Sequence, residues 1–362
     1  MYEKIDVQTV LIEITNACNL YCTHCYNSTE RKIRDNEFMT LENIKYIIKK
    51  CNEYSLDKLY FSGGEPFTHP DILKIIDLCG EYPQTHFTIT TNGLLLNEEY
   101  IKAMEQHENL AVQLSVDGLT KETYESMRGE NTFDRFNDAL NLLLNSKIKP
   151  LTARTCITRL NYKEVPYIFE YLYQKKIAPS FLFVNKMGNA EKNWEKVSLS
   201  MAQMTSMLNT INRLNNHYDY YATPPEPVGA CTFTEKAEMH ALLIKYTGDV
   251  APCQFFYSHN IGNVFKQEIR DILNYNNLRE YYELATKRKE QLENSESCKK
   301  CQIQSICKYG CIGMAEMMGD IMGVDGACYH RMITAACYSN GVLTPLKKEI
   351  KEDAEGRWKK EE

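Results

Sequence analysis

Six short apolar runs rich in β-branched residues alternate with segments of helical periodicity in the first half of the chain. The predicted strands are residues 10–15, 58–64, 86–93, 111–118, 151–158 and 180–185. Predicted helices lie between them, at 41–54, 71–80, 97–107, a stretch ending near 147, and 162–176. This alternation predicts an α/β fold in which helices cover a parallel sheet.

Each of the first four predicted strands is followed by a motif that carries chemistry. The motifs are a cysteine loop at 18–25, GGEP at 63–66, TNG at 91–93 and SVDG at 115–118. Because right-handed crossovers bring the carboxyl ends of parallel strands to one edge, we expect these motifs to form one ligand site.

The cysteine loop reads CNLYCTHCY and places Cys18, Cys22 and Cys25 at C-x3-C-x2-C spacing. Three thiolates can hold a [4Fe–4S] cluster and leave its fourth iron open. They could also hold zinc with a water molecule, although cysteine-built zinc sites are usually closed by a fourth ligand. A third interpretation is that the thiols only pack. Their position on a loop at the predicted ligand edge favours a metal centre.

CNLYCTHCY, SGGEP (62–66), TTNG (90–93) and LSVDG (114–118) together resemble the radical S-adenosylmethionine (SAM) enzymes. The resemblance implies a partial (β/α)6 TIM barrel and a [4Fe–4S] cluster held by Cys18, Cys22 and Cys25. In that family, SAM chelates the open iron. One electron from the cluster then cleaves SAM to a 5′-deoxyadenosyl radical, which abstracts a substrate hydrogen.

The same resemblance assigns cofactor contacts to residues at this edge. The backbone of Tyr26 would meet the adenine, and the GGEP segment would meet the methionyl amine. Asn92 and Arg128 each have an alternative interpretation, as a turn residue and as a surface arginine that caps a helix. The complete predicted set is Tyr26, Gly63, Gly64, Glu65, Pro66, Asn92, Ser115, Asp117 and Arg128.

A second cysteine array follows a turn-rich segment, ATPPEPVGA (222–230). Its order resembles the SPASM extension of radical SAM enzymes, which binds two auxiliary [4Fe–4S] clusters, for three clusters in all. Zinc knuckles are the alternative. By the resemblance, Cys298, Cys301, Cys307 and Cys328 hold the outer cluster, and Cys231, Cys253 and Cys311 hold the inner one.

The inner cluster lacks one expected cysteine, because TPPEP (223–227) occupies its place. Cys337 could supply the fourth ligand, or the iron could stay open and bind substrate. We expect a radical SAM domain at 1–195, a helical linker at 196–230, the SPASM domain at 231–338, and a charged tail at 339–362 that frays.

Net charge, apolar runs and cysteine content indicate which class of protein this is and in which compartment it acts. The formal net charge of −6 over 362 residues gives no global basic footprint for nucleic acid, and no apolar run is long enough to span a membrane. The N-terminus lacks a signal-peptide pattern, so we expect a cytoplasmic protein. In a reducing compartment, 14 cysteines indicate metal binding rather than disulfides.

The resemblance to SPASM enzymes predicts a peptide maturase that installs a thioether or C–C crosslink in a ribosomally made peptide. Sulfatase-maturase-like formylglycine formation is an alternative. However, Gln254 stands where that branch has a basic aspartate, and an amide cannot take a proton at neutral pH. Two further functions are compatible with the sequence: maturation of a haem or quinone precursor, and electron transfer without catalysis.

Three partners follow from the preferred interpretation. They are a precursor peptide, an electron donor such as flavodoxin or ferredoxin, and a separate leader-recognition protein. The last is expected because the first predicted strand begins at residue 10, which leaves no N-terminal recognition domain. Direct contacts with the barrel could replace a separate recognition protein.

Overall fold

The computed structural model describes residues 7–27, 37–220, 233, 241–301, 309–317 and 319–323, together with two short strands between residues 350 and 360. These residues fall into two compact units. Unit 1 contains Met1–Ala17, Lys32–Thr88 and Val228–Arg331, and unit 2 contains Cys18–Arg31, Ile89–Pro227 and Met332–Glu362. The division passes through strand β3 (His86–Thr91), whose two halves belong to different units.

Strand β1 is central to unit 1, where the strand order is β3-β2-β1-β7-β8-β9. It pairs in parallel with β2 on one side and with β7 on the other, so that Val10 lies between Leu59 and Leu242. The β7–β8 and β8–β9 pairs are antiparallel. The strands are β1 (Thr9–Thr15), β2 (Lys58–Gly63), β7 (Ala241–Ile244), β8 (Asp249–Ala251) and β9 (Gly262–Asn263).

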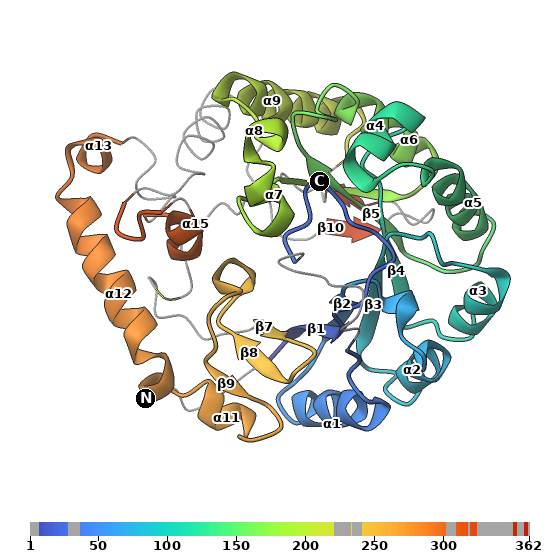
Figure 1. Ribbon diagram of the computed structural model, residues 1–362, viewed down its shortest axis with the longest axis horizontal. Helices are drawn as coiled ribbons and strands as arrows, with labels where there is room; N and C mark the ends of the chain where they lie inside the picture. The colour runs from blue at the N-terminus through green and yellow to red at the C-terminus, as the bar shows by residue number, and fades with distance from the viewer. Residues whose placement is uncertain are drawn as a thin grey trace. The chain divides into compact units, whose positions relative to one another are not determined.

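The helices of unit 1 lie between and after these strands along the chain (Figure 1). The Thr40 hydroxyl caps α1 by accepting a hydrogen bond from Asn43 N, and α1 buries Ile44, Ile47 and Ile48. The elements are α1 (Leu41–Asn52), η1 (Pro66–Thr68), α2 (Ile72–Cys79), η2 (Gln254–Phe256), α11 (Ile269–Ile272), α12 (Tyr275–Glu293), α13 (Glu296–Lys299) and α15 (Ile312–Met317).

Unit 2 has the strand order β6-β5-β4-β3, with β4–β5 and β5–β6 parallel. Its helices α4, α5 and α6 lie on the outer side of β4 and β5 (Figure 1). The elements are β4 (Leu110–Ser115), β5 (Leu151–Ile157), β6 (Ala178–Phe183), α3 (Glu98–Met104), α4 (Lys121–Arg128), α5 (Phe133–Leu144), α6 (Val165–Gln174), α7 (Gly188–Lys192), α8 (Trp194–Val197) and α9 (Met201–His217).

The core of unit 2 forms between these strands and their helices. Residues along β5 alternate between buried and half-buried, as expected for a strand with one face on a helix layer. Phe169 of α6 stacks on Phe181 of β6 with 6.2 Å between ring centroids, which packs α6 against β6.

The alternation of strands and helices predicted from the sequence is confirmed, with ends that differ by a few residues. The stretch predicted as helical up to residue 147 is two helices, because Gly129 adopts φ +107° between α4 and α5. Compact unit 1 joins segments that are distant in the sequence, since β7 pairs with β1 and so connects residues after 227 to the N-terminal strand. The domain boundaries stay a prediction.

Six residues of the charged tail form two short paired strands. Strands β10 (Ile350–Glu352) and β11 (Trp358–Lys360) pair antiparallel, with Lys351 opposite Lys359. Backbone pairing across a short connection needs no apolar pattern, which explains why the charged sequence did not indicate it.

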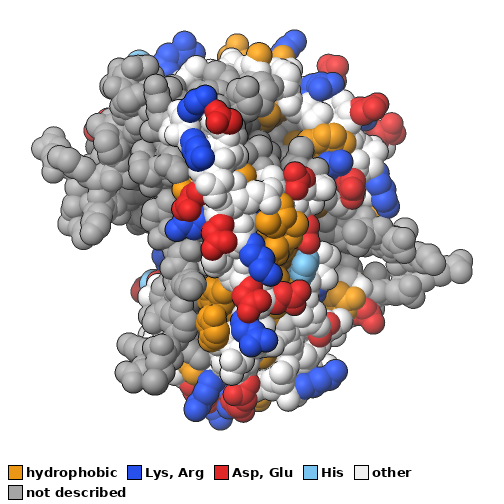
Figure 2. Space-filling model, turned by 90° about the vertical axis from the view of Figure 1, so that its left-hand side faces the viewer, with side chains coloured by type: hydrophobic (Ala, Val, Ile, Leu, Met, Phe, Trp, Pro, Cys, Tyr) orange, Lys and Arg blue, Asp and Glu red, His pale blue; other side chains and the backbone are white. Residues whose placement is uncertain are grey.

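Membrane insertion and binding to nucleic acid can each be compared with the described residues. Within the part of the chain that the structure describes, no helix combines the length and apolar composition needed to cross a membrane. Basic and acidic side chains are interspersed on the face that Figure 2 shows. That face therefore carries no continuous basic patch among its described residues.

Candidate active site

Cys18, Cys22 and Cys25 lie on the loop that follows β1. Cys22 is buried, whereas Cys18 and Cys25 are half-buried. Cys25 N donates a hydrogen bond to Cys22 O at 3.3 Å, so the last two cysteines share one tight turn. The three thiols therefore sit on one short segment with part of their surface open.

Asn92, after β3, connects to this loop. Its Nδ2 donates to Asn19 Oδ1 at 2.9 Å, and its Oδ1 accepts from Leu94 N at 2.9 Å. The side chain thus makes the turn that was one of its two predicted roles, and it also fixes a side chain beside Cys18.

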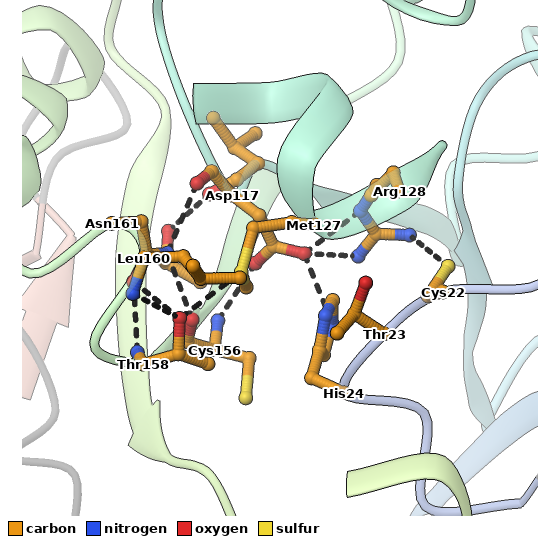
Figure 3. A network of polar contacts seen from close by, with 12 residues as sticks. Cys22, Thr23, His24, Asp117, Met127, Arg128, Cys156, Thr158, Leu160 and Asn161 are labelled. Carbon is orange, nitrogen blue, oxygen red and sulfur yellow. Dashed lines mark hydrogen bonds and ion pairs between the residues drawn. The ribbon is translucent and has the colours of Figure 1, made fainter. Parts of the chain in front are cut away.

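Arg128 at the end of α4 forms a buried ion pair with Asp117 after β4 (Figure 3). Its Nη2 and Nε lie 2.7 and 2.8 Å from Asp117 Oδ2, and the Asp117 side chain has no exposed surface. Cys156 N donates to Asp117 Oδ1 at 2.8 Å. Arg128 is therefore not the surface residue of the alternative interpretation. The two predicted cofactor contacts bind each other.

This ion pair reaches the cysteine loop through the guanidinium. Arg128 Nη1 lies 3.9 Å from Cys22 Sγ (Figure 3). Burial raises the pKa of the Cys22 thiol to about 12, while Arg128 acts in the opposite direction. Burial alone would raise the pKa of Asp117, but Arg128 and His24 hold it well below its usual range. Asp117 is therefore a carboxylate.

His24, between Cys22 and Cys25, is the third member of the network. Its Nε2 lies 3.2 Å from Asp117 Oδ2, and its side chain is 9% exposed. Since Asp117 is a carboxylate, Nε2 carries the hydrogen. His24 Nδ1 is buried and has no hydrogen-bond partner among the described residues. A buried nitrogen of this kind indicates a bound group that supplies the missing partner.

Residues at the start of α7 and directly after it contact the backbone of the cysteine loop. Asn189 donates through Nδ2 to Cys22 O at 3.0 Å and through its backbone N to Cys25 O at 2.9 Å. Asn193 Nδ2 donates to Thr23 O at 3.2 Å. Gly188 has φ +55°, and a Cβ there would lie 2.6 Å from Cys25 O. These residues belong to no motif, and sequence reasoning missed them, as it missed His24.

The donor set of this loop can be tested against the predicted metal centres. Among the described residues, no three His, Cys, Asp or Glu side chains converge to hold a single metal ion. Thiolates are the ligands of iron–sulfur clusters, and one cysteine on each of three irons leaves the fourth iron open. The three thiols on one loop and the buried His24 nitrogen are the donor types that such a cluster with an adjoining organic ligand would use.

The GGEP segment lies in unit 1, after β2. Gly64 N donates to Thr15 O at 2.8 Å, and Glu65 N donates to Ala17 O at 2.7 Å. A Cβ on Gly64 would overlap Ala17 O, so glycine is needed for close approach of the chain to itself. Pro66 begins η1, and the buried Glu65 carboxylate accepts from Phe67 N at 3.2 Å.

Two more of the predicted cofactor contacts lie in unit 2. Ser115 is the half-buried last residue of β4. Tyr26 is 37% exposed, and its carbonyl oxygen packs against Gly188. Contact of any of these residues with a cofactor remains a prediction.

Four cysteines of the second array lie within the described residues, all in unit 1. Cys298 and Cys301 share a turn in which Cys301 N donates to Cys298 O at 3.1 Å. The other four, including the possible extra ligand, lie outside the described residues: Cys231, Cys307, Cys328 and Cys337.

Cys253 and Cys311 belong to segments that pack against each other. Cys253 directly precedes η2, and Cys311 directly precedes α15. A Cβ on Gly313 would lie 2.7 Å from Phe255 Cβ, so only glycine allows α15 to approach η2 this closely. This packing brings together the segments that carry two predicted ligands of the inner cluster.

Three further cysteines belong to neither array. Cys51 and Cys79 are fully buried, and Cys156 packs against a cluster of Val184, Ala190 and Val197. Cys156 also supplies the backbone donor to Asp117, so it lies beside the candidate site.

Two protein-family models match segments of this chain. Residues 12–172 match the radical SAM superfamily, and residues 231–302 match the SPASM iron–sulfur cluster-binding domain. The two matches contain all four strand-end motifs and the first four cysteines of the second array.

Curated relatives have different activities. A probable GTP 3′,8-cyclase of Methanocaldococcus jannaschii is 28% identical over 46% of this chain and 55% of its own length. The Fe-coproporphyrin III synthase of Methanosarcina barkeri is 25% identical over 91% of the chain and 89% of its own. The mycofactocin maturase of Mycobacterium tuberculosis is 30% identical over 42% of the chain and 38% of its own. The chain spans only 55–63% of the first three cyclases that it matches.

Solved structures share the fold. The structure of anSMEcpe with bound AdoMet and Kp18Cys peptide has a TM-score of 0.72 at 20% identity, covering 92% of this chain and 97% of that one. Streptococcus suis SuiB bound to the precursor peptide SuiA has a TM-score of 0.69 at 16% identity, covering 89% and 76%. At these identities the likeness establishes the α/β partial barrel with six parallel strands and a cysteine-rich extension.

Proposed function

Because the chain belongs to the radical SAM superfamily and carries a C-terminal SPASM domain, we propose that it matures a ribosomally made peptide. The proposed reaction abstracts a hydrogen atom from one residue of the peptide and installs a thioether or C–C crosslink. The observation that carries the proposal is the set of three thiols on one loop beside a buried nitrogen without a partner among the described residues.

The residues around this loop have distinct proposed roles. Cys18, Cys22 and Cys25 would hold a [4Fe–4S] cluster, which when bound supplies the electron that cleaves SAM reductively. The guanidinium of Arg128 places positive charge beside Cys22, and Asp117 fixes that guanidinium in two hydrogen bonds. Asn189 donates hydrogen bonds to the carbonyl oxygens of Cys22 and Cys25 and so fixes the backbone of the cysteine loop.

Further cofactor contacts are proposed for residues at the strand ends of each unit. Tyr26, Asn92 and Ser115 are proposed contacts of SAM. For the GGEP segment the proposed contact is the methionyl amine, and its glycines also allow close backbone packing against Thr15 and Ala17.

A peptide substrate is supported by the folds of anSMEcpe and SuiB, whose structures contain peptides. The formylglycine alternative is weaker, because Gln254 begins η2 where an acid would be needed as base. Forming a crosslink requires that one electron be removed after abstraction, and iron–sulfur clusters near Cys253 and Cys311 would accept it. A flavodoxin or ferredoxin would supply the first electron, and a separate protein would recognise the leader.

Maturation of a tetrapyrrole is the second candidate. It is favoured by the Fe-coproporphyrin III synthase, which aligns with 91% of this chain. The two candidates differ in product mass, because a tetrapyrrole enzyme leaves a co-expressed peptide unchanged.

The test is anaerobic co-expression with each short reading frame beside the gene, followed by mass spectrometry of the peptide. A loss of 2 Da per crosslink, which is about the mass of two hydrogens, supports the proposal. An unchanged peptide together with conversion of added Fe-coproporphyrin III contradicts it and supports the second candidate. The triple variant Cys18→Ala/Cys22→Ala/Cys25→Ala should form no 5′-deoxyadenosine.

A further inference from the structure

The cysteine loop is hydrogen-bonded to the carboxyl end of helix α4, within unit 2. Thr23 N donates to Met127 O at 2.9 Å, and Thr23 Oγ1 donates to Ser126 O at 3.1 Å. These carbonyl groups belong to the last turn of α4, where the helix itself offers them no donor. The two hydrogen bonds therefore fix Cys22, the neighbour of Thr23, against the end of the helix that carries Arg128.

The side chain of Arg128 extends this contact to the sulfur of Cys22. Arg128 Nη1 lies 3.9 Å from Cys22 Sγ, while Nε and Nη2 lie 2.8 and 2.7 Å from Asp117 Oδ2 (Figure 3). Because the guanidinium is planar and rigid, a carboxylate that holds two of its nitrogen atoms also fixes the direction of the third. The position of Nη1 beside the sulfur is therefore set by Asp117.

Burial strengthens the effect of this guanidinium on the sulfur. Arginine keeps its positive charge in proteins, and the Arg128 and Asp117 side chains are 9% and 0% exposed. Charges in such surroundings are screened less than charges in water. The guanidinium lies between Asp117 and Cys22, so the positive charge of the pair is the one nearer to the sulfur (Figure 3).

Hydrogen bonds and charge at cysteine sulfurs are among the factors that set the reduction potential of an iron–sulfur cluster. Reduction adds one electron, and hence negative charge, to the cluster and its thiolates. A donated N–H and a positive charge beside one thiolate stabilise this reduced state more than the oxidised state. The position of Arg128 therefore favours reduction of a cluster bound at Cys22.

We propose that Arg128 raises the reduction potential of the cluster held by Cys18, Cys22 and Cys25 through its hydrogen bond to the Cys22 sulfur, and that Asp117 limits this rise. This inference rests on the proposed assignment of the three cysteines as ligands. The cluster gains one electron from a flavodoxin or ferredoxin, and no bond forms or breaks. Arg128 acts through Cys22, so it is a positioning residue. Unlike the SAM contact that the family resemblance implies for Arg128, this role exists before SAM binds.

The two members of the pair should shift the potential in opposite directions. Arg128→Met removes the nearer, positive charge, so the equilibrium constant for one-electron reduction should fall about tenfold, which is about 59 mV. Asp117→Asn removes the negative charge on the far side of the guanidinium and should raise the potential by a smaller amount. Residues that only hold the loop in place would not give shifts of opposite sign.

The test is a redox titration of the holoenzyme, without peptide and without SAM, followed by EPR spectroscopy. The signal of the N-terminal cluster is the one that disappears in the triple variant Cys18→Ala/Cys22→Ala/Cys25→Ala. Leaving out SAM ensures that a shift does not arise through the cofactor carboxylate. Lys121→Met is the matched control, because it removes one positive charge from the exposed start of the same helix and should leave the potential unchanged.

A second comparison covers the case in which Arg128→Met fails to fold. That variant leaves the buried Asp117 carboxylate without its partner, whereas Asp117→Asn/Arg128→Met leaves neither charge of the pair. The potential should therefore fall from Asp117→Asn to the double variant, since the two proteins differ only in the guanidinium. Equal potentials in these two proteins would contradict the proposal.

Three other results overturn the inference: an unchanged potential in folded Arg128→Met, shifts of the same sign in Arg128→Met and Asp117→Asn, and a shift that appears only when SAM is added. A cluster signal that survives in the triple cysteine variant overturns both the ligand assignment and this inference. A chain that cleaves SAM but leaves every peptide unchanged contradicts the proposed function alone, because the titration contains no peptide.

Discussion

Asp117 Oδ2 receives both Nη2 and Nε of Arg128, at 2.7 and 2.8 Å, and the Asp117 and Arg128 side chains are 0% and 9% exposed. Removing one partner leaves a buried charge without compensation, which typically costs about 3–5 kcal/mol. We therefore expect Arg128→Met to lower the thermal unfolding midpoint strongly. Lys102→Met, in an exposed pair with Glu98, should leave it unchanged.

The same pair offers a sharper check by a double substitution. Arg128→Met combined with Asp117→Leu removes both charges, so it should recover part of the stability lost in Arg128→Met alone. A double variant that is no more stable than Arg128→Met alone would contradict this account of the pair.

His24 provides a prediction on cofactor affinity. We expect His24→Phe to keep its iron content and to bind SAM about tenfold more weakly, since one hydrogen bond is worth about 1.4 kcal/mol. Spectroscopic titration with SAM measures this. His86→Phe, on the exposed side of β3, is the control. Unchanged affinity in His24→Phe would show that Nδ1 does not face the cofactor.

Gly64, between β2 and η1, and Gly129, between α4 and α5, test two different costs of adding a Cβ atom. At Gly64 the cost is steric overlap, and at Gly129 it is backbone strain. Gly129 has φ +107° and open space around a Cβ, so Gly129→Ala should cost about 1–3 kcal/mol. Gly64→Ala would overlap Ala17 O, and the chain must move apart to admit it. We expect the larger loss for Gly64→Ala, measured as soluble yield and unfolding midpoint. Equal losses would mean that the two segments separate easily.

Glu164 predicts a pH dependence of stability. Burial alone would raise its pKa, but hydrogen bonds from Thr120 and Leu119 lower it below its ordinary value of 4.5. A depressed folded-state pKa stabilises the fold above the unfolded value, and this stabilisation disappears as pH falls through the folded value. The difference in unfolding midpoint between wild type and Glu164→Gln should therefore be full at pH 7 and shrink below pH 4.5. A difference that stays constant down to acidic pH would contradict it.

Arg288 is predicted to secure the auxiliary region. It is buried and donates to Tyr309 O at 2.5 Å and to Gly323 O at 2.8 Å, on both sides of Cys311. Arg288→Met should lose auxiliary iron while the N-terminal cluster stays intact, measured by iron analysis and Mössbauer spectroscopy. Lys287→Met, exposed on the same helix, should retain its full iron content.

The strand–helix alternation could be read from the sequence because β-branched runs and helical periodicity are local properties. The pairing of β7 with β1 could not be predicted. The four residues of β7, ALLI, carry too little pattern to identify a partner strand more than two hundred positions earlier. Local glycine geometry, as at Gly129, also decides helix ends that periodicity leaves open.

For the candidate site, motifs identified the cysteines and both Asp117 and Arg128. They did not reveal that Asp117 and Arg128 bind each other, because the sequence gives residue types and not their partners. Asn189 and Gly188 were missed for a related reason. Their task is to hold the backbone of Cys22 and Cys25, and backbone acceptors look alike at every position.

The parallel pairing of β1 with β7 has a consequence for biosynthesis. β1 leaves the ribosome more than two hundred residues before β7, its partner on this side, which ends at Ile244. At 5–20 residues per second, the nascent chain waits roughly 10–50 s before that side of β1 can be covered. Over this interval the backbone N–H and C=O groups on that edge of β1 have no strand partner, so the nascent chain carries an exposed strand edge until β7 has emerged.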